Sequence, residues 1–298
     1  GWVSGASALA GVVLGLVALF LVPFLIVFKI SLSDIDLAIP PYTPRLDFNA
    51  GWQGFLRFWA ALDFENYVFL TSDDLYWKAY LSSLRIAFIS TTLTLLIGYP
   101  IAYGIARANT EWRATLLMLV ILPFWTSFLI RVYAWMGILG TEGLLNQLLL
   151  ALGLIETPLT ILNTNWAVYI GIVYTYLPFM ILPIYASLEK LDNSLLEAAI
   201  DLGCSRLRAF WLITMPLSKN GVVAGCFLVF IPALGEFVIP SLLGGSRTLM
   251  IGKVLWEEFF SNRDWPVASA VAIILLLILI IPIILFQRNE QKQREGEQ

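Results

Sequence analysis

The sequence has no histidine, only two cysteines and few charged residues. Without imidazole, and with Cys204 and Cys226 as the sole thiols, it offers no histidine base and no Cys/His metal site. Both cysteines lie in or just after one polar segment, so we expect no disulfide. Charged residues make up 13% of the chain, whereas an average soluble chain is about one-quarter charged. A soluble globule is therefore excluded, and a membrane enzyme is the least favoured class.

The sequence also lacks a phosphate-binding loop. The nearest stretch, Gly245 to Lys253, has six residues between its glycines, and Val254 stands where Ser or Thr would hold magnesium. We therefore expect no cofactor in this chain and assign any hydrolysis of ATP, with its Mg²⁺, to a separate polypeptide.

Long apolar runs dominate what is present, and the mean hydropathy is +0.82. Six runs approach the roughly 20 residues that a helix needs to cross a bilayer. They lie near residues 6–28, 82–105, 114–137, 165–187, 217–240 and 267–286. Their length and continuity exclude barrel strands, and a backbone in lipid must satisfy its own hydrogen bonds. We predict an all-α integral membrane protein with a single domain over residues 1–287 and an irregular cytoplasmic tail over 288–298.

Charge predicts the orientation, because an even number of spans places both ends on one side. With the ends and the loop 190–216 inside, the inner segments hold nine Lys/Arg and the outer segments six. The outer segments also hold twelve Asp/Glu, so they are net negative and favour cations, although ordinary solubilising charge explains this equally well. Since the sequence begins at Gly1 rather than Met, we expect cytoplasmic residues to precede it and the first run to be a retained helix.

The first outer segment, residues 31–80, is rich in aromatic side chains. The spacing of Trp52, Phe55, Phe58 and Trp59 predicts a short helix lying in the membrane interface. This surface suits a partner protein or simple membrane anchoring, and the sequence favours neither.

A charged, helix-prone island, Glu197 to Pro216, separates the fourth and fifth runs. The spacing of Ser194 and Glu197 is typical of a capping box, and Gly203 is suited to end the helix that follows. A second short helix with Arg206 on its basic side leads to Pro216, which suits the first turn of the next long helix. We interpret the island as a rigid docking element at the membrane face, the alternative being an ordinary interfacial loop.

The island resembles the coupling loop of the membrane subunits of bacterial ABC importers. In that loop an E-A-A sequence is followed by Gly four residues later and by an Ile-x-Leu-Pro ending. Only Met215 departs from this pattern, in place of Leu. The positions that match, with two charged neighbours that we add to the coupling segment, are Glu197, Ala198, Ala199, Asp201, Gly203, Arg206, Ile213 and Pro216. The resemblance implies a type I importer membrane domain whose loop sits in a groove of a separate ATPase.

Two stretches place polar chemistry inside apolar runs. Glu236 lies in the fifth run and Arg131 in the third, and ionisable groups in a span need a partner or a water-filled path. A carboxylate with aromatic faces nearby suits an alkyl diammonium ion. We therefore take as candidates for a substrate path or gate Glu236, Trp125, Tyr133, Trp135, Tyr174 and Tyr176. Alternatively, Glu236 pairs with Arg131, a structural counter-charge, or caps a broken helix.

Five stretches resemble the permease subunits of polyamine ABC importers, most closely the putrescine-importing branch. They are Val22–Ser33, Ile89–Tyr103, Ile121–Leu139, Phe227–Gly245 and Asn262–Ala270. The resemblance implies alternating access in the bacterial inner membrane. It also implies a second homologous permease, a homodimeric cytoplasmic ABC ATPase that binds ATP and Mg²⁺, and a periplasmic polyamine-binding protein. An importer for spermidine or another small solute is the main alternative, and a standalone channel or secondary transporter is the alternative from another class.

Overall fold

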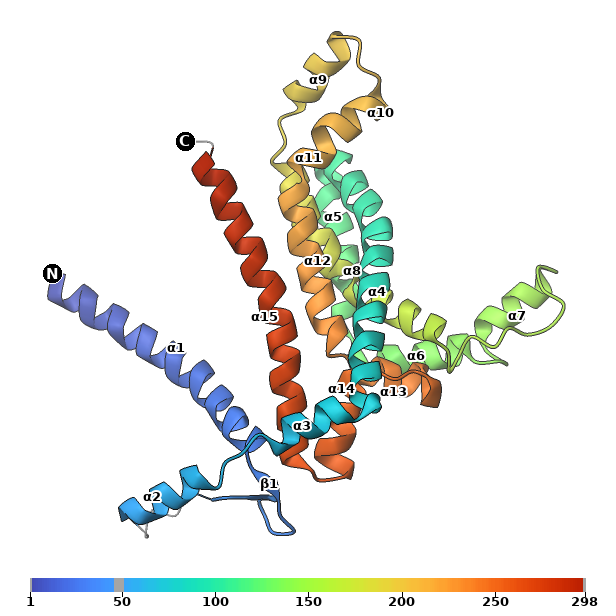
Figure 1. Cartoon of the computed structure of the whole chain (residues 1–298). Coiled ribbons are helices and arrows are strands. Elements are labelled where there is room, and N and C mark those ends of the chain that lie inside the picture. Colours follow the sequence, from blue (N-terminus) through green and yellow to red (C-terminus); the bar gives the residue numbers. More distant parts are fainter. Residues whose placement is uncertain (1, 46–50, 297–298) are drawn as a thin grey trace. The chain divides into compact units, whose positions relative to one another are not determined.

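The computed structural model describes residues 2–45 and 51–296, and helices dominate them (Figure 1). The predicted all-α class is confirmed, since the described residues add to the helices a single pair of two-residue strands. Contacts divide the chain into two compact units, where we predicted one domain over residues 1–287. The first unit contains residues up to Tyr80 and from Val254 onward, and the second contains Leu81–Lys253.

The first unit is built around α1 and α15, which pack against each other, with α3 packed on α15. Asn66 at the start of α3 donates from Nδ2 to the carbonyls of Ser31 and Ser33, at 3.1 and 2.8 Å, and so holds the end of α1. Tyr80 donates its hydroxyl to the Val271 carbonyl at 2.8 Å and ties the first turns of α4 to α15. The elements are α1 (Trp2–Ser31), β1 (Asp34–Ile35), β2 (Tyr42–Thr43), α2 (Gly51–Ala60), α3 (Glu65–Ser72), the start of α4 (Asp74–Arg107), η5 (Glu257–Ser261) and α15 (Trp265–Gly296).

The second unit has its core where α4, α8 and α12 meet, around fully buried Met180, Ile184 and Val229. Gly221 and Gly225 on α12 let its backbone approach α8 closely. A Cβ at Gly221 would lie 2.5 Å from the Pro183 carbonyl oxygen, so only glycine fits there. The elements are the rest of α4, α5 (Thr110–Ile121), η2 (Leu122–Trp125), α6 (Phe128–Leu139), α7 (Leu144–Ala151), α8 (Asn165–Glu189), α9 (Asn193–Asp201), α10 (Arg206–Ala209), η3 (Phe210–Thr214), α11 (Met215–Leu217), α12 (Lys219–Leu234), α13 (Val238–Leu243), η4 (Gly245–Arg247) and the start of α14 (Ile251–Trp256).

The described helices account for most of the predicted spans but not for all of them as single helices. Four stretches are long and apolar enough to cross a membrane, namely Val13–Ser31, Asp74–Arg107, Phe128–Ala151 and Asn165–Glu189. Arg206–Leu217 and Lys219–Leu234 qualify together as one span bent by 64°, and Trp265–Ile280 is a shorter apolar helix. The first, second, fourth and sixth predicted runs thus lie in continuous helices.

The third predicted run, near residues 114–137, is wrong as one helix. The helix α5 ends at Ile121, a 3-10 turn covers Leu122–Trp125, and α6 begins at Phe128. Pro123 explains the break, because its ring disfavours helical geometry before it and it donates no backbone hydrogen bond. The fifth run likewise ends early, at Leu234, with Pro232 in its last turn. Hydropathy alone does not register either break.

Two other expectations concern the outer segment and the tail. A helix does form where the aromatic spacing predicts it, as α2, with Trp52 and Trp59 exposed and Phe58 buried. The Phe55 side chain lies outside the described residues, and the interfacial placement of α2 stays a prediction. The tail, expected to be irregular, continues α15 as helix through Gly296, while residues 297–298 lie outside the described part.

Candidate functional site

The buried carboxylate of Glu236 lies where the fifth span breaks. The helix α12 ends at Leu234, α13 begins at Val238, and Glu236 in between is only 8% exposed. Its Oε1 accepts from the backbone N–H of Val238 at 3.0 Å and from that of Ile239 at 3.4 Å. The first N–H groups of a helix have no acceptor within that helix, and the Glu236 carboxylate supplies one for the start of α13. Glu236 therefore caps a broken helix, which was one of the two alternatives to a role in a substrate path.

The other carboxylate oxygen faces α8. Tyr176 donates its hydroxyl to Glu236 Oε2 at 2.6 Å, a short bond of the kind that a charged acceptor forms. The candidates Tyr176 and Glu236, 60 residues apart in the sequence, are thus in direct contact. Oε1 already accepts from two N–H groups, whereas Oε2 has one partner and keeps accepting capacity for one more donor.

Aromatic rings connect this carboxylate to Arg131. The Tyr176 ring lies 6.1 Å from that of Phe179, which meets Phe124 edge-on at 5.3 Å between centroids. The guanidinium carbon of Arg131 lies 5.1 Å from the Phe124 centroid, a cation–π distance. Among the described residues no carboxylate lies within 4 Å of Arg131, and its buried Nε has no hydrogen-bond partner. The direct pair with Glu236 that we considered is therefore not formed.

The remaining candidates lie apart from the carboxylate. Trp135 and Tyr174 form an edge-on pair with centroids 5.4 Å apart. Trp125 and Tyr133 are 74% and 56% exposed, so they face outward from the second unit. The sequence candidates thus form one cluster at Glu236, a separate aromatic pair and two surface rings.

Sequence reasoning missed the two rings that link Tyr176 to Arg131, Phe124 and Phe179. Each directly follows a proline, Pro123 or Pro178, and this proline–aromatic pair inside an apolar run is a sequence signal that could have identified them.

The predicted coupling segment contains the expected pair of short helices, but with a different start. Asp192, not Ser194, caps α9, since its Oδ1 accepts from the Ser194 N–H at 2.9 Å. The capping box that we expected between Ser194 and Glu197 is therefore wrong. The earlier residue reaches the free N–H groups first, because α9 already begins at Asn193. This hydrogen bond also lowers the pKa of the exposed Asp192 carboxyl below its ordinary value.

The stop signal at Gly203 is confirmed. Gly203 adopts the left-handed conformation with φ +83°. The N–H of Gly203 donates to the Ile200 carbonyl and that of Cys204 to the Ala199 carbonyl, both at 2.9 Å, which is the Schellman pattern. Ser205 then caps α10 through a 3.4 Å bond from the Arg208 N–H. The segment is therefore two short helices joined by a defined turn.

The surface of the coupling segment is open to solvent and partly apolar. Glu197, Ala198, Asp201, Gly203, Arg206 and Pro216 are exposed, and Ala199 and Ile213 are half-buried. Leu202 and Leu207, 88% and 71% exposed, flank the turn. Beside Glu197 lies a hollow of about 320 Å³ that Arg107 and Arg113 also line. Exposed apolar side chains beside charged ones are typical of a surface that a partner protein covers.

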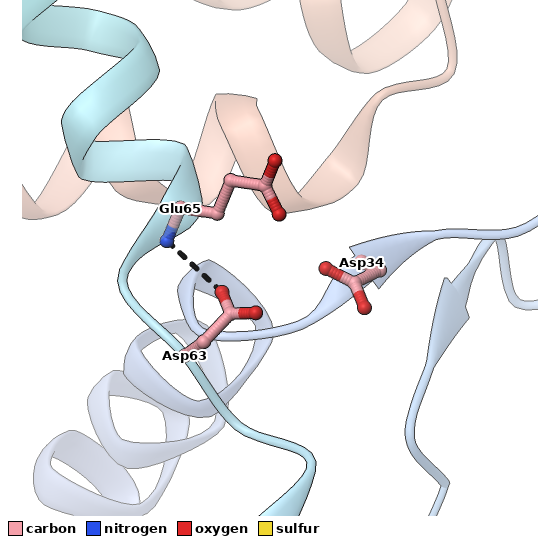
Figure 2. A group of neighbouring side chains, drawn as sticks. All are labelled: Asp34, Asp63 and Glu65. Atoms are coloured by element: carbon pink, nitrogen blue, oxygen red, sulfur yellow. Dashed lines mark hydrogen bonds between the residues drawn. The ribbon is translucent and has the colours of Figure 1, made fainter.

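Three carboxylates gather in the first unit, as Figure 2 shows for Asp34, Asp63 and Glu65. Their oxygens lie within 4.8 Å of one another and all three residues are exposed. Asp63 Oδ1 accepts from the Glu65 N–H at 2.9 Å, at the start of α3. Exposed acidic groups of this kind need no ion, so we assign them as local negative charge on the segment between α1 and α4.

Comparisons with known proteins place these features in context. Residues 95–294 match the family described as "Binding-protein-dependent transport system inner membrane component". The chain is 46% identical over 224 residues to the spermidine/putrescine transport system permease protein PotB of Haemophilus influenzae, covering 75% of this chain and 78% of that protein. The PotB of Escherichia coli K12 has the same identity over 224 residues, with 81% of its length covered.

A solved structure shares the fold. The crystal structure of a bacterial ABC transporter involved in the import of the acidic polysaccharide alginate contains a chain that superposes with a TM-score of 0.68 at 17% identity. The match covers 98% of this chain and 96% of that one.

Proposed function

This chain belongs to the binding-protein-dependent transport system inner membrane component family, and we propose that it imports a polyamine, with putrescine as the preferred substrate. It is a transport subunit with the membrane-domain fold of ABC importers, and the ATPase is a separate subunit. The relatives named for spermidine and putrescine support the substrate class. Putrescine in particular rests on the sequence resemblance to the putrescine-importing branch.

The observation that carries the substrate class is the buried carboxylate of Glu236 with aromatic rings beside it. A diammonium ion needs a negative group for each charged end or a ring face over which the charge lies. Glu236 supplies the carboxylate. Tyr176 contacts it through the hydroxyl, and the Phe179 ring packs against the Tyr176 ring. An inorganic anion would find its charge opposed by Glu236 and by the acidic outer segment.

The mechanism we propose is alternating access with both termini in the cytoplasm. A periplasmic polyamine-binding protein delivers the substrate to the outer face. A homodimeric ATPase closes on ATP and Mg²⁺ and displaces the coupling segment around Glu197, so that the spans open outward. A second, homologous permease completes the path. Hydrolysis resets the spans and releases the polyamine inward, and this chain makes or breaks no covalent bond.

The test is uptake and ATPase activity of the complete reconstituted complex, comparing wild type with Glu236→Gln. The glutamine keeps an oxygen that accepts from the Val238 N–H, so the helix cap survives. The charge is lost, and the NH2 group in place of Oε2 no longer accepts from the Tyr176 hydroxyl. A charge-assisted hydrogen bond contributes about 1.5–3 kcal/mol, so we expect putrescine uptake to fall roughly 10- to 100-fold while the complex stays assembled.

Two controls separate the charge from the fold. Glu142→Gln removes an exposed carboxylate from an outer loop and should leave uptake unchanged. Tyr176→Phe keeps the charge but removes the 2.6 Å bond, and we expect an intermediate loss. Wild-type uptake by Glu236→Gln would contradict the role of this carboxylate. If neither putrescine nor spermidine stimulates the wild-type complex, the polyamine assignment fails, and competition between the two decides the preference.

A further inference from the structure

One tyrosine of α4 contacts the start of an unusual helical turn near the end of the coupling segment and also the bend that follows this segment. Residues Phe210–Thr214 form a π-helical turn, in which the Met215 N–H donates to the Phe210 carbonyl. Such turns are rare and are frequently found at functional sites. Thr214 in this turn is 1% exposed, and within the described part of the chain its hydroxyl has no hydrogen-bond partner. The turn therefore leaves a buried polar group unsatisfied, which a purely structural segment rarely does.

At the start of the turn, the Phe210 ring packs against Tyr99 and Tyr103 of α4, which together we call the notch. The Phe210 ring meets Tyr99 and Tyr103 edge-on, with centroids 5.7 and 5.5 Å apart and both interplanar angles 89°. Residues four apart lie on one face of a helix, so the two tyrosines grip Phe210 from successive turns. The Arg107 guanidinium carbon lies 5.5 Å from the Tyr103 centroid and extends the same face.

Tyr99 also contacts Ser218, the residue at the bend between α11 and α12. The Tyr99 hydroxyl and Ser218 Oγ are 2.8 Å apart in a buried hydrogen bond between residues 119 apart in the sequence. Ser218, fully buried, separates α11 from α12, and the helical stretches on its two sides are bent by 64°. Tyr99 thus contacts Phe210 with its ring and Ser218 with its hydroxyl.

The short helices α9 and α10 of the coupling segment lead directly to the contact between Phe210 and α4. From α9 the chain passes the hydrogen-bonded turn at Gly203 and the cap at Ser205, and α10 ends at Ala209, next to Phe210. Hydrogen bonds fix both the turn at Gly203 and the cap at Ser205. A displacement of α9 should therefore reach Phe210 with little loss. At the end of this route, the notch joins the segment to aromatic side chains of α4.

We propose that Phe210, Tyr99 and Tyr103 are positioning residues that transmit displacement of the coupling segment to α4. The proposal rests on the proposed function, since it needs an ATPase that moves α9. Phe210 pulls on the notch, and the Tyr99 hydroxyl carries the bend at Ser218 with it. The segment and α4 then move as one body.

The first experiment measures substrate imported per ATP hydrolysed by the reconstituted complex. We expect Phe210→Ala and Tyr103→Ala to lower this ratio about tenfold, the loss that corresponds to edge-on aromatic pairs, while ATP hydrolysis continues. Tyr103→Phe keeps the ring and should behave as wild type, and Tyr99→Phe, which removes only the bond to Ser218, should lower the ratio. The control is Phe88→Ala, an aromatic residue of α4 that is 67% exposed. A wild-type ratio in assembled Phe210→Ala and Tyr99→Phe complexes would overturn the proposal.

The second experiment needs ATP but no assumption about substrate. Nitroxide labels replace the exposed Leu195 on α9 and Leu96 on α4, in a chain with Cys204→Ser and Cys226→Ser. The distance between the labels should be the same in the nucleotide-free and vanadate-trapped complexes, and should differ between them in Phe210→Ala. A distance that changes between the two states without the Phe210 substitution would show that α9 moves apart from α4, which refutes transmission even if polyamines prove not to be the substrate.

Discussion

Replacing Gly203 tests whether the turn of the coupling segment must be left-handed. With φ at +83°, a residue with a Cβ is strained there, at a cost of about 1–2 kcal/mol. A Cβ at Gly203 would meet no other atom within 4 Å, so no steric clash adds to this cost. Gly203→Ala therefore isolates the backbone effect. It should reduce the population of the native turn roughly 5- to 30-fold.

A graded series makes the prediction specific. Asn tolerates the left-handed region, so Gly203→Asn should approach wild type. Proline fixes φ near −65° and removes the N–H that donates to the Ile200 carbonyl at 2.9 Å, so Gly203→Pro should cost about 3 kcal/mol or more. We expect the substrate imported per ATP hydrolysed to fall in the order Asn, Ala, Pro. This cost falls on the native turn alone, because Gly203 is exposed and outside the core, so thermal unfolding of the core in the same samples should stay nearly constant.

Two outcomes would refute this reasoning. Coupled uptake by Gly203→Pro at the wild-type ratio would show that the turn has no part in coupling. Equal losses in Gly203→Asn and Gly203→Pro would show that the absence of a side chain matters there, and not the sign of φ.

Two further predictions concern stability. Gly225→Leu should lower the free energy of unfolding by about 1–3 kcal/mol, because a Cβ at this position would lie 2.8 Å from Met180 Sδ between α8 and α12. Gly104→Leu is the control and should not lower it, because a Cβ there has nothing within 4 Å. Thermal unfolding in detergent measures both variants. Burial raises the pKa of the Asp264 carboxyl above its ordinary value, although its bond from the Val267 N–H opposes this. Because the pKa of Asp264 is raised in the folded state, its protonated carboxyl contributes to the free energy of unfolding. This contribution is present in full below the unfolded pKa of about 4 and is lost as pH rises through the folded pKa. Asp264→Asn keeps an oxygen for the cap and should therefore be at least as stable as wild type at pH 7, and a lower stability there would contradict the assignment.

Several site features were within reach of the sequence, for identifiable reasons. The stop at Gly203 depends on glycine alone reaching a positive φ freely, and the cap of α13 by Glu236 was one of the roles considered. The start of α9 was misjudged because two residues, Asp192 and Ser194, both suit a cap, and only the backbone geometry decides between them. A pair of Arg131 with Glu236 was one of the alternatives considered, yet the guanidinium lies over the Phe124 ring, and its buried Nε has no hydrogen-bond partner among the described residues.

By itself the sequence determined the membrane class, the all-α fold and the stop at Gly203. These follow from composition or from spacing along the chain, which folding does not alter, whereas the separate ATPase follows from the resemblance to ABC importers. Only the tertiary structure decided which ring reaches Glu236, where the third run breaks, and that Tyr99 meets both Phe210 and Ser218. Those contacts join residues as far as 119 positions apart. They depend on how each helix is rotated and how closely glycines such as Gly221 let helices approach, which no local pattern encodes.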